Sequence, residues 1–102
     1  MKISSRDSLA MIKAIGAEEN FTTHGALSGV ANPEYAYPGQ MPEAHAQRLA
    51  RDLATGDVTY MIVSYVTPIA WKMRDGSVRR PRVTYSRTTS AHQGKAGYVL
   101  GE

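Results

Sequence analysis

The side chains best suited to chemistry gather near the end of the chain, at a predicted junction between a strand and a helix. They are Tyr85, Ser86, Arg87, Thr88, Thr89, Ser90, His92 and Gln93. A hydroxyl beside an imidazole can act as a nucleophile, but this chemistry also needs an orienting carboxylate and oxyanion donors, and the local sequence marks neither. A small hydrolase or nuclease centred on His92 is therefore one hypothesis. The structural alternative is that Ser86, Thr88 or Thr89 caps the following helix while His92 and Gln93 bond loop carbonyls.

A second group of side chains is basic and flanks a predicted hairpin turn. Its members are Arg74, Arg79, Arg80, Arg82 and Arg87. Such a group could bind phosphates, and Trp71 and Tyr85 could add stacking on a single-stranded nucleic acid. Because strand residues alternate between faces, Arg80 and Arg82 would point one way and Arg79 the other. Since a basic edge strand also protects a sheet against edge-to-edge aggregation, nucleic-acid binding and edge protection both remain open.

Metal and cofactor chemistry has little support in the sequence. His24, His45 and His92 are far apart, and no paired-histidine motif places two of them on one face. The chain has no cysteine, which excludes disulfides, thiolate zinc sites and cysteine nucleophiles. Gly25 and Gly29 lack the Gly-Lys-Ser/Thr of a phosphate loop and favour a tight turn instead. We therefore expect no metal site and no cofactor.

A single α+β domain spanning residues 1–102 must position these side chains, since this length is typical of one domain. We expect a small antiparallel meander sheet of about three or four strands, flanked by two or three helices. The sequence predicts helices over 5–15, 42–55 and about 90–100. In the second of them Ala46, Leu49, Ala50 and Leu53 form the apolar face, and the opposite, solvent-facing side includes Asp52.

The strands are predicted from runs of β-branched and aromatic residues. Residues 58–65 are apolar on both alternating sets, which indicates a central strand covered on both faces. Thr67-Pro68 is predicted to interrupt the ladder, and the next strand would bury Ile69 while exposing Ala70. Asp75-Gly76 is a strong hairpin signal, and the strand that returns over 78–85 must be an edge or carry a bulge because of Pro81. Residues 17–41 are expected to be mostly loop, with a brief strand around 20–23 left open.

Composition limits the location and the kind of partner. The 12 Lys and Arg residues exceed the 9 Asp and Glu residues only slightly, and the formal net charge of +3 permits an acidic partner without indicating one. The longest apolar runs are only a few residues, too short to cross a bilayer. The start of the sequence lacks the apolar core of a secretory signal. We therefore expect no membrane association and a cytoplasmic location.

Two stretches together resemble a known family. They are Ser64-Tyr65-Val66-Thr67-Pro68-Ile69-Ala70-Trp71 and Tyr85-Ser86-Arg87-Thr88-Thr89-Ser90-Ala91-His92-Gln93. The pair resembles a family of small bacteriophage proteins of unknown function, which combine an S-Y-x-T-P-I-A strand with a later Y-S-x-T-T-x-x-H-Q motif. The likeness covers residues 60–97 and implies origin and fold rather than mechanism. It also implies that residues 21–29 pack near the motif.

The resemblance and the missing catalytic signals lead to one functional expectation. The chain should be a non-enzymatic phage accessory protein that binds a host macromolecule in the host cytoplasm, above all a host protein. Nucleic-acid binding through the arginines and hydrolysis at His92 are the alternatives, and both monomer and homodimer remain open. The motif residues Ser64, Tyr65, Thr67 and Pro68, with those of the second motif, are expected to serve either folding or binding.

Overall fold

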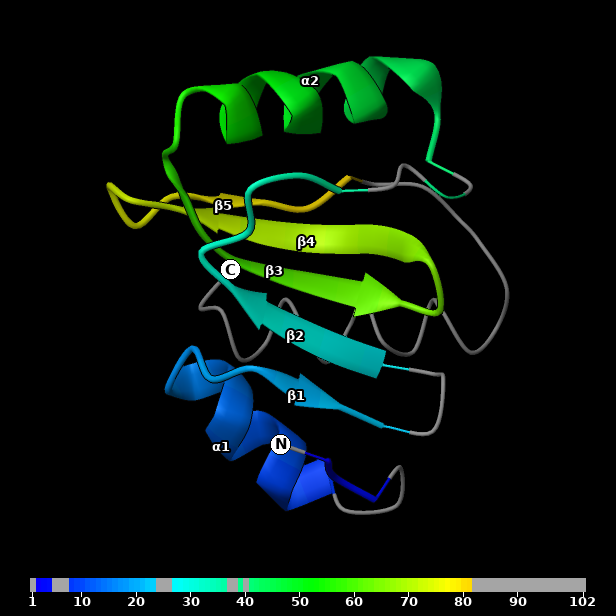
Figure 1. The fold of residues 1–102 in the computed structure, drawn as a ribbon, viewed down its shortest axis with the longest axis vertical. Helices are drawn as coiled ribbons and strands as arrows, with labels where there is room; N and C mark the ends of the chain where they lie inside the picture. Colours follow the sequence, from blue (N-terminus) through cyan, green and yellow to red (C-terminus); the bar gives the residue numbers. More distant parts are fainter. Residues whose placement is uncertain (1, 5–7, 24–26, 37–38, 40, 82–102) are drawn as a thin grey trace.

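The computed structural model describes residues 2–4, 8–23, 27–36, 39 and 41–81, and in this part of the chain it contains two helices and a five-stranded antiparallel sheet (Figure 1). In chain order the elements are α1 (Ser8–Gly16), β1 (Phe21–Thr22), β2 (Leu27–Ala31), α2 (Glu43–Ala54), β3 (Val58–Ser64), β4 (Thr67–Met73) and β5 (Val78–Arg79). Each strand pairs with the strand before it, so the sheet is a meander in the order β1-β2-β3-β4-β5. The predicted α+β class and meander topology are confirmed, with a larger sheet than the three or four strands expected.

The sheet is larger because residues 27–31 form a strand where the sequence predicted a turn. Gly29 lies in β2, opposite Phe21 of β1 and Ile62 of β3. A Cβ atom at Gly29 would collide with the hydroxyl of Tyr60 and would lie 2.5 Å from Cε1 of Phe21. This glycine therefore serves close packing within a strand, and the predicted tight turn at Gly29 is wrong. Gly25, its predicted partner in that turn, lies outside the described residues.

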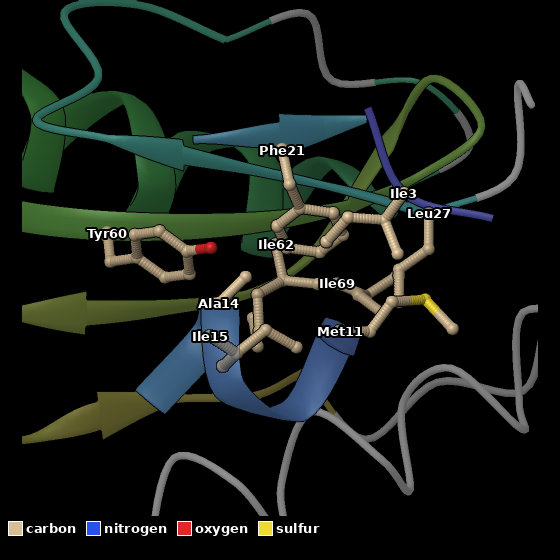
Figure 2. Close-up of a cluster of buried hydrophobic side chains, with 10 residues drawn as sticks. Ile3, Met11, Ala14, Ile15, Phe21, Leu27, Tyr60, Ile62 and Ile69 are labelled. Atoms are coloured by element: carbon tan, nitrogen blue, oxygen red, sulfur yellow. The ribbon is translucent and has the colours of Figure 1, made fainter. Parts of the chain in front are cut away.

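The two helices pack against opposite faces of the sheet. Figure 2 shows the first core, to which α1 contributes Met11, Ala14 and Ile15. The other members of this core are Ile3, Phe21, Leu27, Tyr60, Ile62, Ile69 and Ala70. Leu49 of α2 belongs to a second core with Met41, Val58, Met61, Trp71 and Met73. Because β3 supplies residues to both cores, the prediction that it is covered on both faces is confirmed.

Tyr60 brings a polar group into the first core. Its side chain is fully buried, and its hydroxyl donates a hydrogen bond to the backbone carbonyl oxygen of Glu19 at 2.7 Å. Burial raises the pKa of the Tyr60 hydroxyl well above its usual range, and the carboxylates of Glu18 and Glu19 raise it further. The phenol therefore stays neutral, with its single donor satisfied.

The helix α2 matches its predicted range but not the predicted use of two of its residues. Ala50, predicted on the apolar face, is exposed, whereas Asp52, predicted on the solvent side, is only 9% exposed. The carboxylate of Asp52 accepts a hydrogen bond from Nε1 of Trp71 at 2.8 Å and lies 3.4 Å from Nε of Arg79. A buried carboxylate is tolerated when it has such partners, so the sequence prediction for Asp52 was wrong because both partners lie on distant strands.

The connection between β3 and β4 also differs from the prediction. Thr67 and Pro68 do not interrupt the ladder: they belong to β4 and pair with Ser64 and Val63. The chain reverses in the turn formed by residues 65 and 66. Beyond Pro68 the register shifts by one residue, a bulge that suits proline because proline cannot donate to the ladder. As a result Ile69 and Ala70 both enter the first core, and the predicted exposure of Ala70 is wrong.

The predicted hairpin at Asp75-Gly76 is confirmed. Gly76 adopts a φ of +91°, and the side chain of Asp75 accepts hydrogen bonds from the backbone N–H and the hydroxyl of Ser77. These hydrogen bonds lower the pKa of Asp75. The returning strand β5 lies at an edge of the described sheet, just before Pro81.

The rest of the predicted strand and the predicted helix over 90–100 lie outside the described residues. No helix in the described ranges has the length and apolar character needed to span a bilayer.

Candidate functional site

The first motif forms the hairpin end that joins β3 to β4. Ser64 and Thr67 face each other across the hairpin, and both are buried. Ser64 also pairs with Leu27 of β2, so residues 27–29 lie on the strand next to the first motif, which is what the resemblance implied for this part of the segment 21–29. Pro68 is buried as well. These three motif residues therefore build the sheet, whereas Tyr65 stands apart from them.

Tyr65 occupies the turn in an unusual conformation. Its φ is +56°, in the left-handed region that favours glycine and asparagine in two-residue hairpin turns. For a bulky side chain this conformation costs about 1 kcal/mol or more. Tyr65 is nevertheless 54% exposed, and the neighbouring Val66 is 60% exposed. A strained backbone position that presents an aromatic and an aliphatic group to solvent is a candidate for function.

An apolar groove of about 570 Å³ begins at this turn and runs along the sheet face that α2 also covers. This apolar groove is lined by Val30, Asn32, Pro33, Glu34, Tyr35, Ala36, Met61, Val63, Val66 and Pro68. The floor of the groove comes from β2, β3 and β4. One wall is formed by the connection from β2 to α2, which is drawn in teal in Figure 1. Tyr35 on that wall is 84% exposed. The volume is within the range that accommodates a few apolar side chains or a small molecule.

The connection that forms this wall is fixed at two points. Near its start, the backbone N–H of Asn32 donates to the carbonyl oxygen of Thr59 at 2.9 Å. Further along, Gly39 has a φ of +60° and packs directly on the turn: a Cβ atom there would lie 2.7 Å from Cα of Thr67 and 2.8 Å from the carbonyl oxygen of Val66. Thr67 thus helps to hold the wall in place, which gives this motif residue a role in shaping the groove.

The arginines that the sequence grouped together have separate surroundings. Arg74 donates a hydrogen bond to the carbonyl oxygen of Gly56 at 3.0 Å and lies 3.9 Å from the carboxylate of Asp57. Arg79 pairs instead with the buried Asp52, and together with Arg80 it lines a hollow between α2 and β5 that Arg74 does not reach. The structure therefore brings Arg79 and Arg80 together and leaves Arg74 at the hairpin end.

The remaining predicted residues lie outside the described part of the chain. They are His24, Arg82, Tyr85, Ser86, Arg87, Thr88, Thr89, His92 and Gln93. Catalysis at His92 and capping by the hydroxyl residues therefore stay predictions. The third histidine, His45, is half-buried on α2. Within the described ranges, no three histidine, aspartate or glutamate side chains come together as possible metal ligands.

Sequence reasoning missed most of the residues that line the groove. Tyr35 and Ala36 belong to a stretch rich in turn formers, and Val30 and Met61 belong to strands whose faces the sequence could not distinguish. One signal was present: a tyrosine within a proline- and glycine-rich loop has no local packing reason to be there.

Comparison with known proteins gives a family without an activity. A model described as a family of unknown function (DUF8033) matches residues 10–99, which is most of the chain. The protein therefore belongs to this family. Searches of curated proteins and of solved structures found no significant match. The family description agrees with the expectation of a family whose function has not been assigned.

Proposed function

We propose that this member of the DUF8033 family is a non-enzymatic bacteriophage accessory protein that binds a host protein through the apolar groove. The observation that carries the proposal is the exposed Val66 in the lining of that groove. It follows Tyr65 in a turn whose backbone is strained at Tyr65, and the Tyr65 side chain is exposed as well. The phage origin and the action in the host cytoplasm come from the motif resemblance and from the composition.

The groove suits apolar side chains of a protein segment. Its floor of Val30, Met61 and Val63 presents aliphatic and thioether groups, and Tyr35 and Val66 stand exposed at its rim. Exposed aromatic and aliphatic side chains around an apolar depression are typical of the centre of a protein interface. Contact with such a lining would be made by burial of apolar surface, which supports binding rather than acid–base catalysis.

Charge narrows the kind of partner. Glu34 is the one charged side chain among the lining residues that the structure describes, and it lies on the exposed wall beside Tyr35. A partner segment with apolar anchors and an adjacent lysine or arginine would therefore match both the floor and the rim. We expect the occupant to be such a segment of a host protein.

The test is affinity capture from a host lysate with matched variants of the bait. Val66→Ser removes an apolar group that is 60% exposed at the groove, and Leu9→Ser removes one that is 63% exposed on α1, which packs on the other face of the sheet. We expect one host protein to be enriched by the wild type and by Leu9→Ser but lost with Val66→Ser. Binding of that purified protein should weaken about tenfold or more with Val66→Ser, as is typical of an interface hot spot.

A partner retained equally by Val66→Ser and Leu9→Ser would show that the groove is not the binding surface. Recovery of no saturable partner, with a bait that circular dichroism shows to be folded, would count against protein binding altogether. Thermal unfolding of both variants is measured alongside, so that a loss of capture cannot be confused with a loss of fold.

A further inference from the structure

A second depression, separate from the apolar groove, lies between α2 and the β5 edge of the sheet. It has a volume of about 360 Å³ and is lined by His45, Arg48, Trp71, Arg79, Arg80 and Pro81. We call it the basic hollow. Its described lining shares no residue with the apolar groove, so a role for one does not depend on a role for the other.

The fold brings these basic side chains together from two elements. His45 and Arg48 are three residues apart on α2 and therefore lie on the same side of that helix. Arg79 ends β5 and Arg80 follows it, so the usual alternation of strand side chains no longer separates the two. Trp71 of β4 is only 1% exposed and closes the bottom of the hollow.

One wall of the hollow is held by the buried carboxylate of Asp52. Its Oδ2 atom accepts a hydrogen bond from Nε1 of Trp71 at 2.8 Å and lies 3.4 Å from Nε of Arg79. This contact uses the Nε–H of Arg79 and leaves its two terminal nitrogens outside it. Arg48, Arg79 and Arg80 all line this hollow, and Asp52 holds Arg79 at its edge.

We propose that the basic hollow binds the phosphate group of a small phosphorylated metabolite. Guanidinium groups match the oxygens of a phosphate in a bidentate manner, and His45 adds a further N–H donor from α2. The volume is suited to a compact ligand. Because the indole of Trp71 is buried and already donates to Asp52, it offers no open face for stacking a base. That burial favours a compact phosphate ester over a single-stranded nucleic acid, whose binding depends on stacking.

The test is calorimetric titration with ribose 5-phosphate, with ribose as the control that lacks the phosphate and with a short oligothymidylate as the nucleic-acid control. Trp71 is the only tryptophan in the chain, so its fluorescence reports independently on occupation of the hollow. We expect ribose 5-phosphate to bind and to change this fluorescence, and ribose to do neither. Inorganic phosphate should compete with ribose 5-phosphate.

Two arginines of α2 provide a matched pair of variants. Arg48→Gln removes a guanidinium group from the hollow, and Arg51→Gln removes an exposed one that does not line it. Arg48→Gln should weaken binding of ribose 5-phosphate about tenfold or more, the effect of losing a hydrogen bond to a charged group, while Arg51→Gln should leave it unchanged.

Three results would overturn this proposal. The first is that ribose 5-phosphate does not bind to the folded protein in the millimolar range. The second is that Arg48→Gln and Arg51→Gln bind it equally. The third is that the oligothymidylate binds much more tightly than ribose 5-phosphate, with the same dependence on Arg48. The last result would make the hollow a nucleic-acid site. None of these outcomes bears on the capture experiment with Val66→Ser, so the two proposals fail separately.

Discussion

Replacing Gly29 by alanine tests the account of why this glycine lies inside a strand. The added methyl group would meet the hydroxyl of Tyr60, and it would lie 2.5 Å from Cε1 of Phe21 and 2.7 Å from Cζ of Tyr60. Both rings are almost completely buried, with exposed fractions of 1% for Phe21 and 0% for Tyr60. Neither ring can therefore move outward into solvent without disturbing the first core.

The expected loss of stability follows from two effects. Forcing an extra methyl group into a packed core typically costs about 1–3 kcal/mol. If the Tyr60 ring moves, its hydroxyl also loses the 2.7 Å hydrogen bond to the carbonyl oxygen of Glu19, which adds roughly 1 kcal/mol. We expect Gly29→Ala to lower the free energy of unfolding by about 2–4 kcal/mol, a large part of the stability of a domain of this size. The melting temperature should fall by on the order of 10–20 °C.

Urea and thermal unfolding followed by circular dichroism measure this loss, with Gly16→Ala as the matched control. Gly16 is the last residue of α1, and a Cβ atom there would meet nothing within 4 Å. Alanine at this position should be neutral or stabilise by about 0.5 kcal/mol. The double variant Gly29→Ala/Tyr60→Phe should be less destabilised than the sum of its single changes, because the nearest clashing atom is gone. Equal stability of Gly29→Ala and Gly16→Ala, or strict additivity in the double variant, would refute the packing argument.

Three further predictions concern single residues. Asp52→Ala should destabilise the fold by about 1–3 kcal/mol, since the buried indole N–H of Trp71 loses its acceptor. Asp52→Asn keeps an acceptor oxygen and should lose less stability. Urea unfolding followed by Trp71 fluorescence measures both variants, and an equal loss of stability in the two would contradict this reasoning. Burial raises the folded-state pKa of Tyr60 above its unfolded value of about 10. The stabilisation that comes from the neutral phenol should therefore be fully present below that pH and be lost as the pH rises above it. Urea midpoints measured against pH should decline less steeply for Tyr60→Phe than for the wild type. Tyr65→Asn should raise the melting temperature, since asparagine tolerates the left-handed backbone. The same variant should weaken capture of the host partner. A lower melting temperature would show that the Tyr65 side chain supports the fold.

Local signals predicted the elements whose partners are close in sequence. The β-branched and aromatic run of β3, the Asp75-Gly76 turn and the apolar spacing of α2 each specify their structure within a few residues. The strand β2 could not be found in this way. A glycine is required at position 29 because the ring of Tyr60 packs against it. Tyr60 belongs to β3, which follows α2 in the sequence and is therefore distant from β2 along the chain. Without that partner, the same glycine is typical of a turn.

The candidate sites escaped prediction for the same reason. The apolar groove exists because the connection after β2 folds back over β3 and β4, where Gly39 packs on Thr67. No periodicity within residues 32–41 encodes that path. The bulge beyond Pro68 similarly reversed the expected face of Ala70. The sequence predicted an interruption at Thr67-Pro68, whereas both residues pair within the ladder and the register shifts just after them.

Asp52 is the residue for which distant partners matter most. Seen within α2 it resembles any solvent-facing acidic residue, but once β4 and β5 pack against the helix its carboxylate orients both Trp71 and Arg79. This ion pair is partly buried and adds little net stability, yet removing Arg79 would leave the buried carboxylate of Asp52 without its cationic partner. Substituting Arg79 would therefore mix a defect of folding with a defect of binding. Arg48, which is exposed on α2, lines the same hollow, so its substitution separates phosphate binding from the integrity of the core.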